Sequence, residues 1–385
     1  MRPDPSPLAR HWGLDPGVVF LNHGSFGACP TAVLERQARY RAEIEANPVE
    51  FLARRLPALM EDAGHALAGA LGGDPRRLLP VANATTGVNT VVRSVPLEPG
   101  DEVLITSSTY RACAHAVRHI AAERGADVVV VPLPVPISTP GTVVDAIVSS
   151  VSSRTRLAVI DHVTSPTAAV LPIDRIVTSL ADRGVATLVD GAHGPGMLPL
   201  DLRSIPALAY VGNCHKWLLT PKGAGFVHAD EAFLPHLTPL VVSHGWAPEP
   251  SPDRTRAMFG WTGTGDPTPF LAIPDALRFI DTELGGLAAM QSANHDLVRG
   301  AARIVSGASG LVPCAPDDMT GTMVSFVLPA DAPADLDAGL RDRWGVEVPL
   351  IEWPETGQRF VRISAQAYNA PAQYEYLAGA LASEL

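Results

Sequence analysis

Short apolar runs that alternate with helical patterns between about residues 76 and 230 are the feature that most constrains this chain's fold. The runs are apolar at almost every position and lie at residues 102–106, 128–131, 157–160, 186–189 and 209–211. Strands that are apolar throughout are typical of a parallel sheet that is buried on both faces. The pattern therefore predicts an α/β fold with a mainly parallel sheet covered by helices.

The intervening segments predict helices. Residues 86–95 carry valines at helical spacing, and a second apolar stripe from Cys113 to Ala121 is expected to end at Gly125. Beyond about residue 270 the pattern changes to strands at 323–328 and 359–363 and helices near 334–343 and 371–384. We therefore predict a large domain at residues 26–268 and a smaller α+β domain at 269–385, with residues 1–25 packing against the small domain.

Charge and cysteine content restrict the partners. A net charge of −11 argues against nucleic acid or an anionic membrane surface as the main partner. The first residues lack the apolar centre of a signal peptide, and no apolar run is long enough to cross a membrane. The four cysteines lie far apart without a C-x-x-C pair, which suits a reducing compartment. We expect a cytoplasmic enzyme that acts on a small molecule.

Asp190 and Lys216 point to the chemistry. Asp190 ends the apolar run 185–189, and Lys216 follows 26 residues later. A lysine amine can hold the aldehyde of pyridoxal phosphate as a Schiff base, while an aspartate keeps the pyridine nitrogen protonated. Alternatives remain for each residue: Asp190 could cap a helix or bind a metal, and Lys216 could lie at the surface. Lys222, between a proline and a glycine, is expected in an exposed turn.

Other polar residues also follow apolar runs and are expected at the same sheet edge, because ligands of such sheets bind beyond the carboxyl ends of the strands. Thr85 and Thr86 open the valine-rich helix and could cradle a phosphate or simply cap the helix. Tyr110 could stack on a cofactor ring or pack between domains. Arg362, inside a strand, could hold a substrate carboxylate or form an internal salt bridge.

Several longer motifs carry a family resemblance. They are Asn22-His-Gly-Ser-Phe-Gly27, Asp161-His-Val-Thr-Ser-Pro-Thr167, Asp190-Gly-Ala-His193, His215-Lys216 and Arg362-Ile-Ser-Ala-Gln-Ala-Tyr-Asn369. With them the chain resembles the fold-type I pyridoxal-phosphate enzymes of aminotransferase class V, and within that class the isopenicillin N epimerase-like branch. The resemblance implies a large domain with a mainly parallel seven-stranded sheet, pyridoxal 5'-phosphate as cofactor and a homodimer with active sites at the subunit interface.

The resemblance also implies a role for each candidate residue. Around the cofactor ring, Lys216 would form the Schiff base, Asp190 would pair with the ring nitrogen, His193 would lie near the ring hydroxyl and Tyr110 would stack. The phosphate would be held by Thr85, Thr86, His215 and, from the partner subunit, the residue equivalent to Thr264 in the segment 261–266. The substrate would be lined by Asn22, His23 and Ser165, with its carboxylate on Arg362.

The predicted activity is a pyridoxal-phosphate-dependent change at Cα or Cβ of an amino acid, either epimerisation or β-elimination from a cysteine-derived substrate. By analogy it would serve the biosynthesis of a small natural product such as an antibiotic. An aminotransferase and a decarboxylating deaminase are the alternatives with the same cofactor. The glycine-rich segment 261–266, and Arg111 directly after Tyr110, depart from the epimerase pattern and leave its substrate open.

Two functions of other classes compete. A metal-dependent hydrolase could use the side chains of Asp190, His162, His193, His215 and His244. That hypothesis leaves Lys216 unexplained, and no two of the four histidines named for it have helical i, i+4 spacing. A binding protein without catalysis is disfavoured, because Lys216 and Asp190 are both intact.

Overall fold

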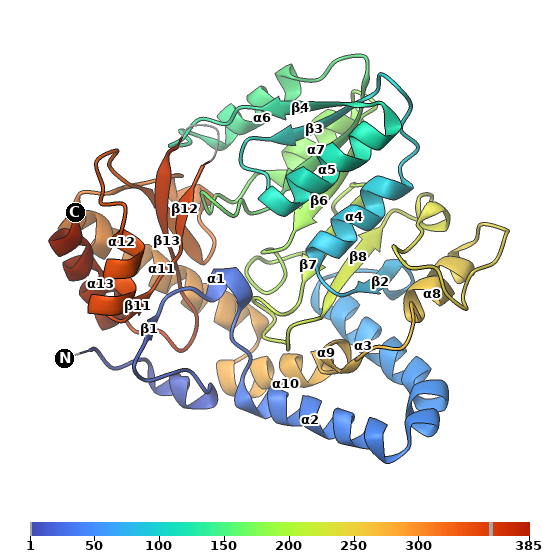
Figure 1. Cartoon of the computed structure of the whole chain (residues 1–385), viewed down its shortest axis with the longest axis horizontal. Coiled ribbons are helices and arrows are strands. Elements are labelled where there is room, and N and C mark those ends of the chain that lie inside the picture. The colour runs from blue at the N-terminus through green and yellow to red at the C-terminus, as the bar shows by residue number, and fades with distance from the viewer. Residues whose placement is uncertain (1, 354–356) are drawn as a thin grey trace.

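The computed structural model describes residues 2–353 and 357–385, and a seven-stranded sheet forms its centre (Figure 1). The order across the sheet is β2-β8-β7-β6-β5-β3-β4, and only β8 runs antiparallel to its neighbours. The strands are β2 (Leu78–Val81), β3 (Glu102–Thr106), β4 (Asp127–Val131), β5 (Thr155–Asp161), β6 (Ala186–Gly191), β7 (Ala209–Asn213) and β8 (Gly225–Ala229). The predicted α/β class and mainly parallel sheet are confirmed.

Helices cover both faces of this sheet, which explains why its central strands are mostly apolar. One face packs against α4 (Ala84–Ser94) and α5 (Arg111–Arg124), and α5 ends at Gly125 in the left-handed conformation, as predicted. The other face packs against α3 (Leu56–Ala70), α6 (Pro140–Ser149) and α7 (Ile173–Ala181). Two separate apolar cores therefore hold the strand ends in place.

The prediction that residues 128–131 are a fully buried strand is wrong. They form β4, which pairs only with β3 and lies at the edge of the sheet. Val131 is buried, but Val130 is 41% exposed. A strand with one neighbour has less of its surface covered, and its composition alone does not reveal that position.

The C-terminal part is built on a four-stranded antiparallel sheet in the order β12-β13-β10-β9. Its strands are β9 (Val312–Pro313), β10 (Met323–Val327), β12 (Leu350–Glu352) and β13 (Arg359–Ser364). The helices α11 (Leu287–Ser309), α12 (Leu336–Ala338) and α13 (Pro371–Glu384) accompany it. Near the N-terminus, β1 (Val19–Phe20) pairs in parallel with β11 (Val346–Glu347), so both ends of the chain lie on this side (Figure 1). The domain boundaries themselves stay a prediction.

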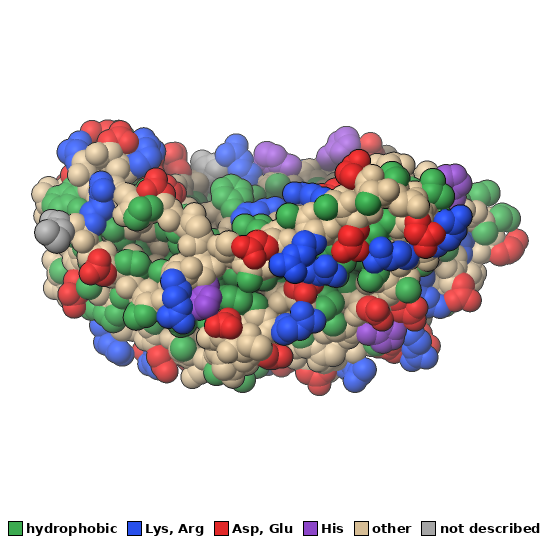
Figure 2. All heavy atoms as spheres, turned by 90° about the horizontal axis from the view of Figure 1, so that it is seen from below, with side chains coloured by type: hydrophobic (Ala, Val, Ile, Leu, Met, Phe, Trp, Pro, Cys, Tyr) green, Lys and Arg blue, Asp and Glu red, His purple; other side chains and the backbone are tan. Residues whose placement is uncertain are grey.

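The described residues form five further α-helices. They are α1 (His23–Phe26), α2 (Thr31–Ala46), α8 (Pro252–Gly260), α9 (Thr268–Leu271) and α10 (Ile273–Leu284). On the face seen in Figure 2, basic and acidic side chains are interspersed. On α2, Arg36 pairs with Glu43. Among the described residues, no helix has both the length and the apolar character needed to cross a membrane.

Candidate active site

Two aspartates lie side by side where β5 and β6 end. Asp161 and Asp190 are direct partners in the parallel register, and both are buried. Asp190 accepts hydrogen bonds from the backbone N–H of Ala192 (3.0 Å) and from the Cys113 thiol (3.1 Å). Asp161 accepts one from the backbone N–H of Tyr110 (3.2 Å), and its second oxygen has no partner. The sheet thus presents a buried pair of carboxyl groups.

Burial raises the pKa of both carboxyl groups. The pKa of Asp161 lies well above its usual value because of burial and of the neighbouring Asp190. The pKa of Asp190 is raised by burial and opposed by its hydrogen bonds and by the positive charge of Lys216. Two carboxylates this close do not ionise together readily. Asp161 therefore holds a proton more firmly, and Asp190 is the member of the pair available to a cation.

Lys216 follows β7 in the turn-rich segment between β7 and β8, and its Nζ lies 3.1 Å from Nε2 of His193. Burial and the nearby positive charge of Arg362 lower the pKa of Lys216 to about 7. Nδ1 of His193 accepts from the Trp217 indole (3.4 Å), and burial holds the pKa of His193 well below its usual value. A neutral lysine amine, which is the nucleophilic form, is thus accessible near neutral pH.

Residues His23 and Gly27 pack against the backbone at His215 and Lys216. The buried ring of His23 lies between the hydroxyl of Tyr368 (2.9 Å) and the carbonyl oxygen of Lys216 (2.9 Å). Gly27 has a positive φ of 70°, and a Cβ there would collide with the carbonyl oxygen of His215. The structure therefore places His23, expected beside the substrate, beneath the Lys216 backbone with both ring nitrogens engaged.

Arg362 reaches across from β13 to this site. Its guanidinium donates to the carbonyl oxygen (2.7 Å) and hydroxyl (3.2 Å) of Ser165 and to the hydroxyl of Ser25 (3.2 Å). Arg362 is 3% exposed, and burial lowers its pKa to about 10. Within the described part of the chain no carboxylate pairs with it, so the internal salt bridge considered for Arg362 is not formed. A buried guanidinium without a counterion is suited to a ligand carboxylate.

Asn22 is linked to Arg362 through the hydroxyl of Ser25. Its side chain accepts a hydrogen bond from Ser25 (2.6 Å) and donates to Glu347 (3.1 Å). The contacts of Asn22 therefore orient Ser25, which in turn contacts Arg362. Ser25 was not singled out from the sequence, because its role depends on a strand more than 300 residues away.

The start of α4 offers backbone donors. Asn83 caps the helix by accepting from the backbone N–H and the hydroxyl of Thr86 (2.9 and 3.1 Å), so the capping role expected of a threonine falls to Asn83. Thr85 is in the first turn, where backbone N–H groups lack helical partners. On the other side, Nδ1 of His215 is buried without a hydrogen-bond partner. A phosphate group would satisfy donors of this kind.

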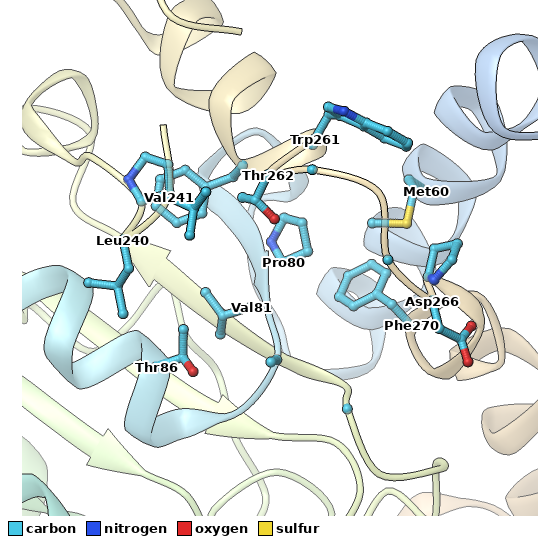
Figure 3. A pocket seen from close by; sticks show the side chains of 18 of the residues that line it. Met60, Pro80, Val81, Thr86, Leu240, Val241, Trp261, Thr262, Asp266 and Phe270 are labelled. Atoms are coloured by element: carbon cyan, nitrogen blue, oxygen red, sulfur yellow. The ribbon is translucent and has the colours of Figure 1, made fainter. Parts of the chain in front are cut away.

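Figure 3 shows Thr86 at a cavity of about 270 Å³ that is also lined by Leu240, Val241, Trp261 and Thr262. The segment 261–266, which includes Trp261 and Thr262, also contains Thr264, which is exposed. Within the single chain, no hydrogen bond joins Thr264 to Lys216 or Asp190. Its predicted contact with a partner's phosphate remains a prediction.

Tyr110 and Ser165 line a second cavity of about 480 Å³, together with Arg362 and the first two turns of α5. Tyr110 is 45% exposed. The structure thus gathers Tyr110, Ser165 and Arg362 on one side of the site, and Lys216, Asp190 and His193 at its base. Asp161 and Cys113 complete the base; Cys113 was expected only as an apolar helix residue.

These residues fit pyridoxal phosphate. The buried Asp190 suits the ring nitrogen, and the amine of Lys216 suits the aldehyde. The orphaned Nδ1 of His215 and the N-terminal turn of α4 suit the phosphate. By contrast, the described residues contain no group of three or more His, Cys, Asp or Glu side chains arranged to hold a metal ion. Nδ1 of His162 instead lies 3.0 Å from the Tyr210 hydroxyl. The metal-dependent hydrolase therefore has no geometric support.

Comparison with known proteins agrees with this geometry. The profile of the family described as aminotransferase class-V matches residues 19–377. Isopenicillin N epimerase of Streptomyces clavuligerus is 38% identical over 96% of this chain and 95% of its own length. The Amycolatopsis lactamdurans isopenicillin N epimerase is also 38% identical with the same coverage. A putative L-cysteine desulfhydrase of Oryza sativa subsp. japonica is 30% identical over 95% of this chain and 83% of its own.

Solved structures share the fold at lower identity. A variant of C-DES with glycine covalently linked to the PLP cofactor has a TM-score of 0.85 at 20% identity, covering 98% of this chain and 99% of that one. The apo cysteine desulfurase of Thermococcus onnurineus NA1 has a TM-score of 0.83 at 18% identity, covering 100% and 99%. A profile match over nearly the whole chain and relatives at 38% identity establish the relationship. The chain therefore belongs to the class V aminotransferase family, whose enzymes use pyridoxal phosphate.

Proposed function

We propose that this protein is a pyridoxal-phosphate enzyme that removes the Cα proton of an amino acid and epimerises Cα. The observation that carries the proposal is the position of Lys216. The chain has only two lysines, Lys216 and Lys222, and Lys222 is exposed. Lys216 instead lies beside His193, with a pKa lowered to about 7. An amine with this pKa is suited both to bind an aldehyde and to act as a general base.

Bound pyridoxal phosphate supplies an electron sink that stabilises negative charge at Cα. The chain's own residues would hold the reactants in place. Asp190 would keep a proton on the ring nitrogen, and Arg362 would bind the α-carboxylate with Ser165 and Ser25 fixing its guanidinium. Lys216, once released by the incoming amine, would take the Cα proton. Tyr110 would stack on the cofactor ring, and a proton taken from solvent on the other face of Cα would complete the inversion.

β-Elimination is the second candidate. It shares proton removal from Cα and differs in the loss of a Cβ substituent. The relatives named putative L-cysteine desulfhydrases, 30% and 31% identical to this chain, support it, whereas the two epimerases at 38% support inversion. A role in making a small natural product rests on the epimerase relatives alone.

We also propose a homodimer. Leu240, Val241 and Trp246 are exposed apolar residues, and Trp261 borders the same cavity as Leu240 and Val241. A second copy covering this region would place Thr264 close to the other subunit's phosphate site. The four cysteines, all free and buried, support a reducing cytoplasmic location.

The test uses the two lysines as a matched pair. We expect borohydride reduction of the holoenzyme to leave a pyridoxyl group on Lys216 alone, as located by peptide mass spectrometry. Lys216→Ala should abolish this label and Cα-proton exchange in deuterated water, while Lys222→Ala keeps both. A label on Lys222, or repeated turnover by Lys216→Ala, would refute the assignment. Incubation with D- and L-amino acids and S-substituted cysteines then separates inversion from release of pyruvate.

A further inference from the structure

The cavity of about 480 Å³ extends beyond the residues needed to hold an α-amino acid. From Ser165 and Arg362 it continues between the first turns of α5 and the strand β12. Its size is in the roughly 300–1,000 Å³ range of sites that enclose ligands much larger than a single small amino acid.

One wall of the cavity is basic. Arg111, His115 and Arg118 all line it and are spaced i, i+4 and i+7, so they lie on one face of α5. All three side chains are exposed to the cavity side of the helix. Arg111 and Arg118 are separated by about 10 Å along the helix axis. Anions at different depths in the cavity are therefore within reach of this face.

These three basic side chains lack partners among the residues that the structure describes. None of the three takes part in a hydrogen bond or ion pair there. The acid of the same helix, Glu123, pairs with Arg93 and His119 instead. The facing wall contributes one described carboxylate, Glu352, which lies beyond ion-pair distance of the three. In a chain of net charge −11, a local excess of positive charge in a cavity attracts an anion.

We propose that this cavity binds a second, distal carboxylate of the substrate, and that Arg111 and Arg118 recognise it. The proposal rests on the proposed function, because Arg362 must hold the α-carboxylate. The substrate is then an α-amino acid whose side chain continues several bonds beyond Cβ and ends in a carboxylate. A free cysteine has no group that reaches α5, so the cationic face selects against it. Guanidinium groups suit this task because they bind carboxylates bidentately.

The test measures the binding of probe molecules to the holoenzyme. Binding is monitored through the change in cofactor absorbance. The probes are both enantiomers of 2-aminopimelate and of its ω-amide, which differ in the distal charge and hardly in size. We expect the acid to bind at least about tenfold more tightly than the amide, as for one charge-assisted hydrogen-bonded contact. The preference should shrink as salt is raised, because these cations are exposed.

Substitutions on α5 test which residues cause the preference for the acid over the amide. Arg111→Gln with Arg118→Gln should reduce it to less than about twofold, whereas Arg124→Gln, on the same helix but outside the cavity, should leave it intact. Arg118→Glu should bind an ω-amine of equal chain length more tightly than the ω-acid. A misfolded variant would not gain this reversed preference. Equal binding of acid and amide, or a preference that survives the double substitution, would overturn the proposal.

The outcome is separable from failure of the proposed function. Alanine, which has no distal group, reports Cα-proton exchange by itself. If alanine exchanges and the acid is not preferred, only the distal-carboxylate proposal falls. If no pyridoxyl label reaches Lys216, the proposed function falls and this proposal with it.

Discussion

Single residues of one type behave differently at this site, as the neighbouring Asp161 and Asp190 illustrate. Because the pKa of Asp161 is raised well above its usual value, its neutral form prevails, and an amide resembles that form. Asp190 is expected to act as an anion beside the ring nitrogen. We predict that Asp190→Asn slows Cα-proton exchange by about a hundredfold or more, and Asp161→Asn by far less. Exchange rates at saturating cofactor measure this; equal losses would contradict the distinct charges.

Lys216 leads to a pH prediction. Its pKa of about 7 is lowered by burial and by Arg362, and only the neutral amine attacks the cofactor aldehyde. The rate at which apoenzyme captures pyridoxal phosphate should therefore rise with pH and reach half its maximum near pH 7. Arg362→Gln removes a repelling positive charge, so the pKa of Lys216 should rise and the midpoint should move to higher pH. Stopped-flow absorbance measures both profiles; a midpoint that stays or falls contradicts the coupling.

At the scale of elements, α4 must lie close to the sheet for its first turn to reach the cofactor site. A Cβ at Gly87 would lie 2.9 Å from Cγ1 of Val211 on β7, closer than side chains pack. In Gly87→Ala, this clash should lower the free energy of unfolding by about 1–3 kcal/mol. The higher helix propensity of alanine offsets roughly 1 kcal/mol of that loss. It should also weaken cofactor binding by displacing the first turn.

Gly64, in the middle of α3, is the matched control. A Cβ there meets nothing within 4 Å, so Gly64→Ala gains helix propensity without a clash. We expect this variant to be more stable by up to about 1 kcal/mol. Chemical denaturation of both variants decides the matter, since the two substitutions are predicted to have opposite signs.

At the scale of the whole molecule, the proposed dimer depends on the apolar surface at residues 240–246 and the segment 261–266. Val241→Arg places a charge in that surface and should give monomers with weakened cofactor binding, because Thr264 of the other subunit is lost. Val312→Arg changes a valine of equal exposure, 55%, in the C-terminal part and should remain dimeric. Light scattering with cofactor titration measures both; a dimeric Val241→Arg protein would place the interface elsewhere.

Local sequence determined much of this protein. Buried strands, the helix stop at Gly125 and the C-terminal helix 371–384 were predictable because apolar periodicity, turn residues and caps act over a few residues. The candidate residues at strand ends could be named for the same reason, since parallel strands deliver their carboxyl ends to one edge.

Tertiary structure alone decided which of those residues face one another. The exposed position of β4, the place of His23 beneath Lys216 and the contact of Cys113 with Asp190 depend on segments distant in sequence. The lowered pKa of Lys216 likewise needs burial and Arg362, which is 146 positions further along the chain. Burial and charge separation are properties of three-dimensional distance, and no local pattern of residues encodes them.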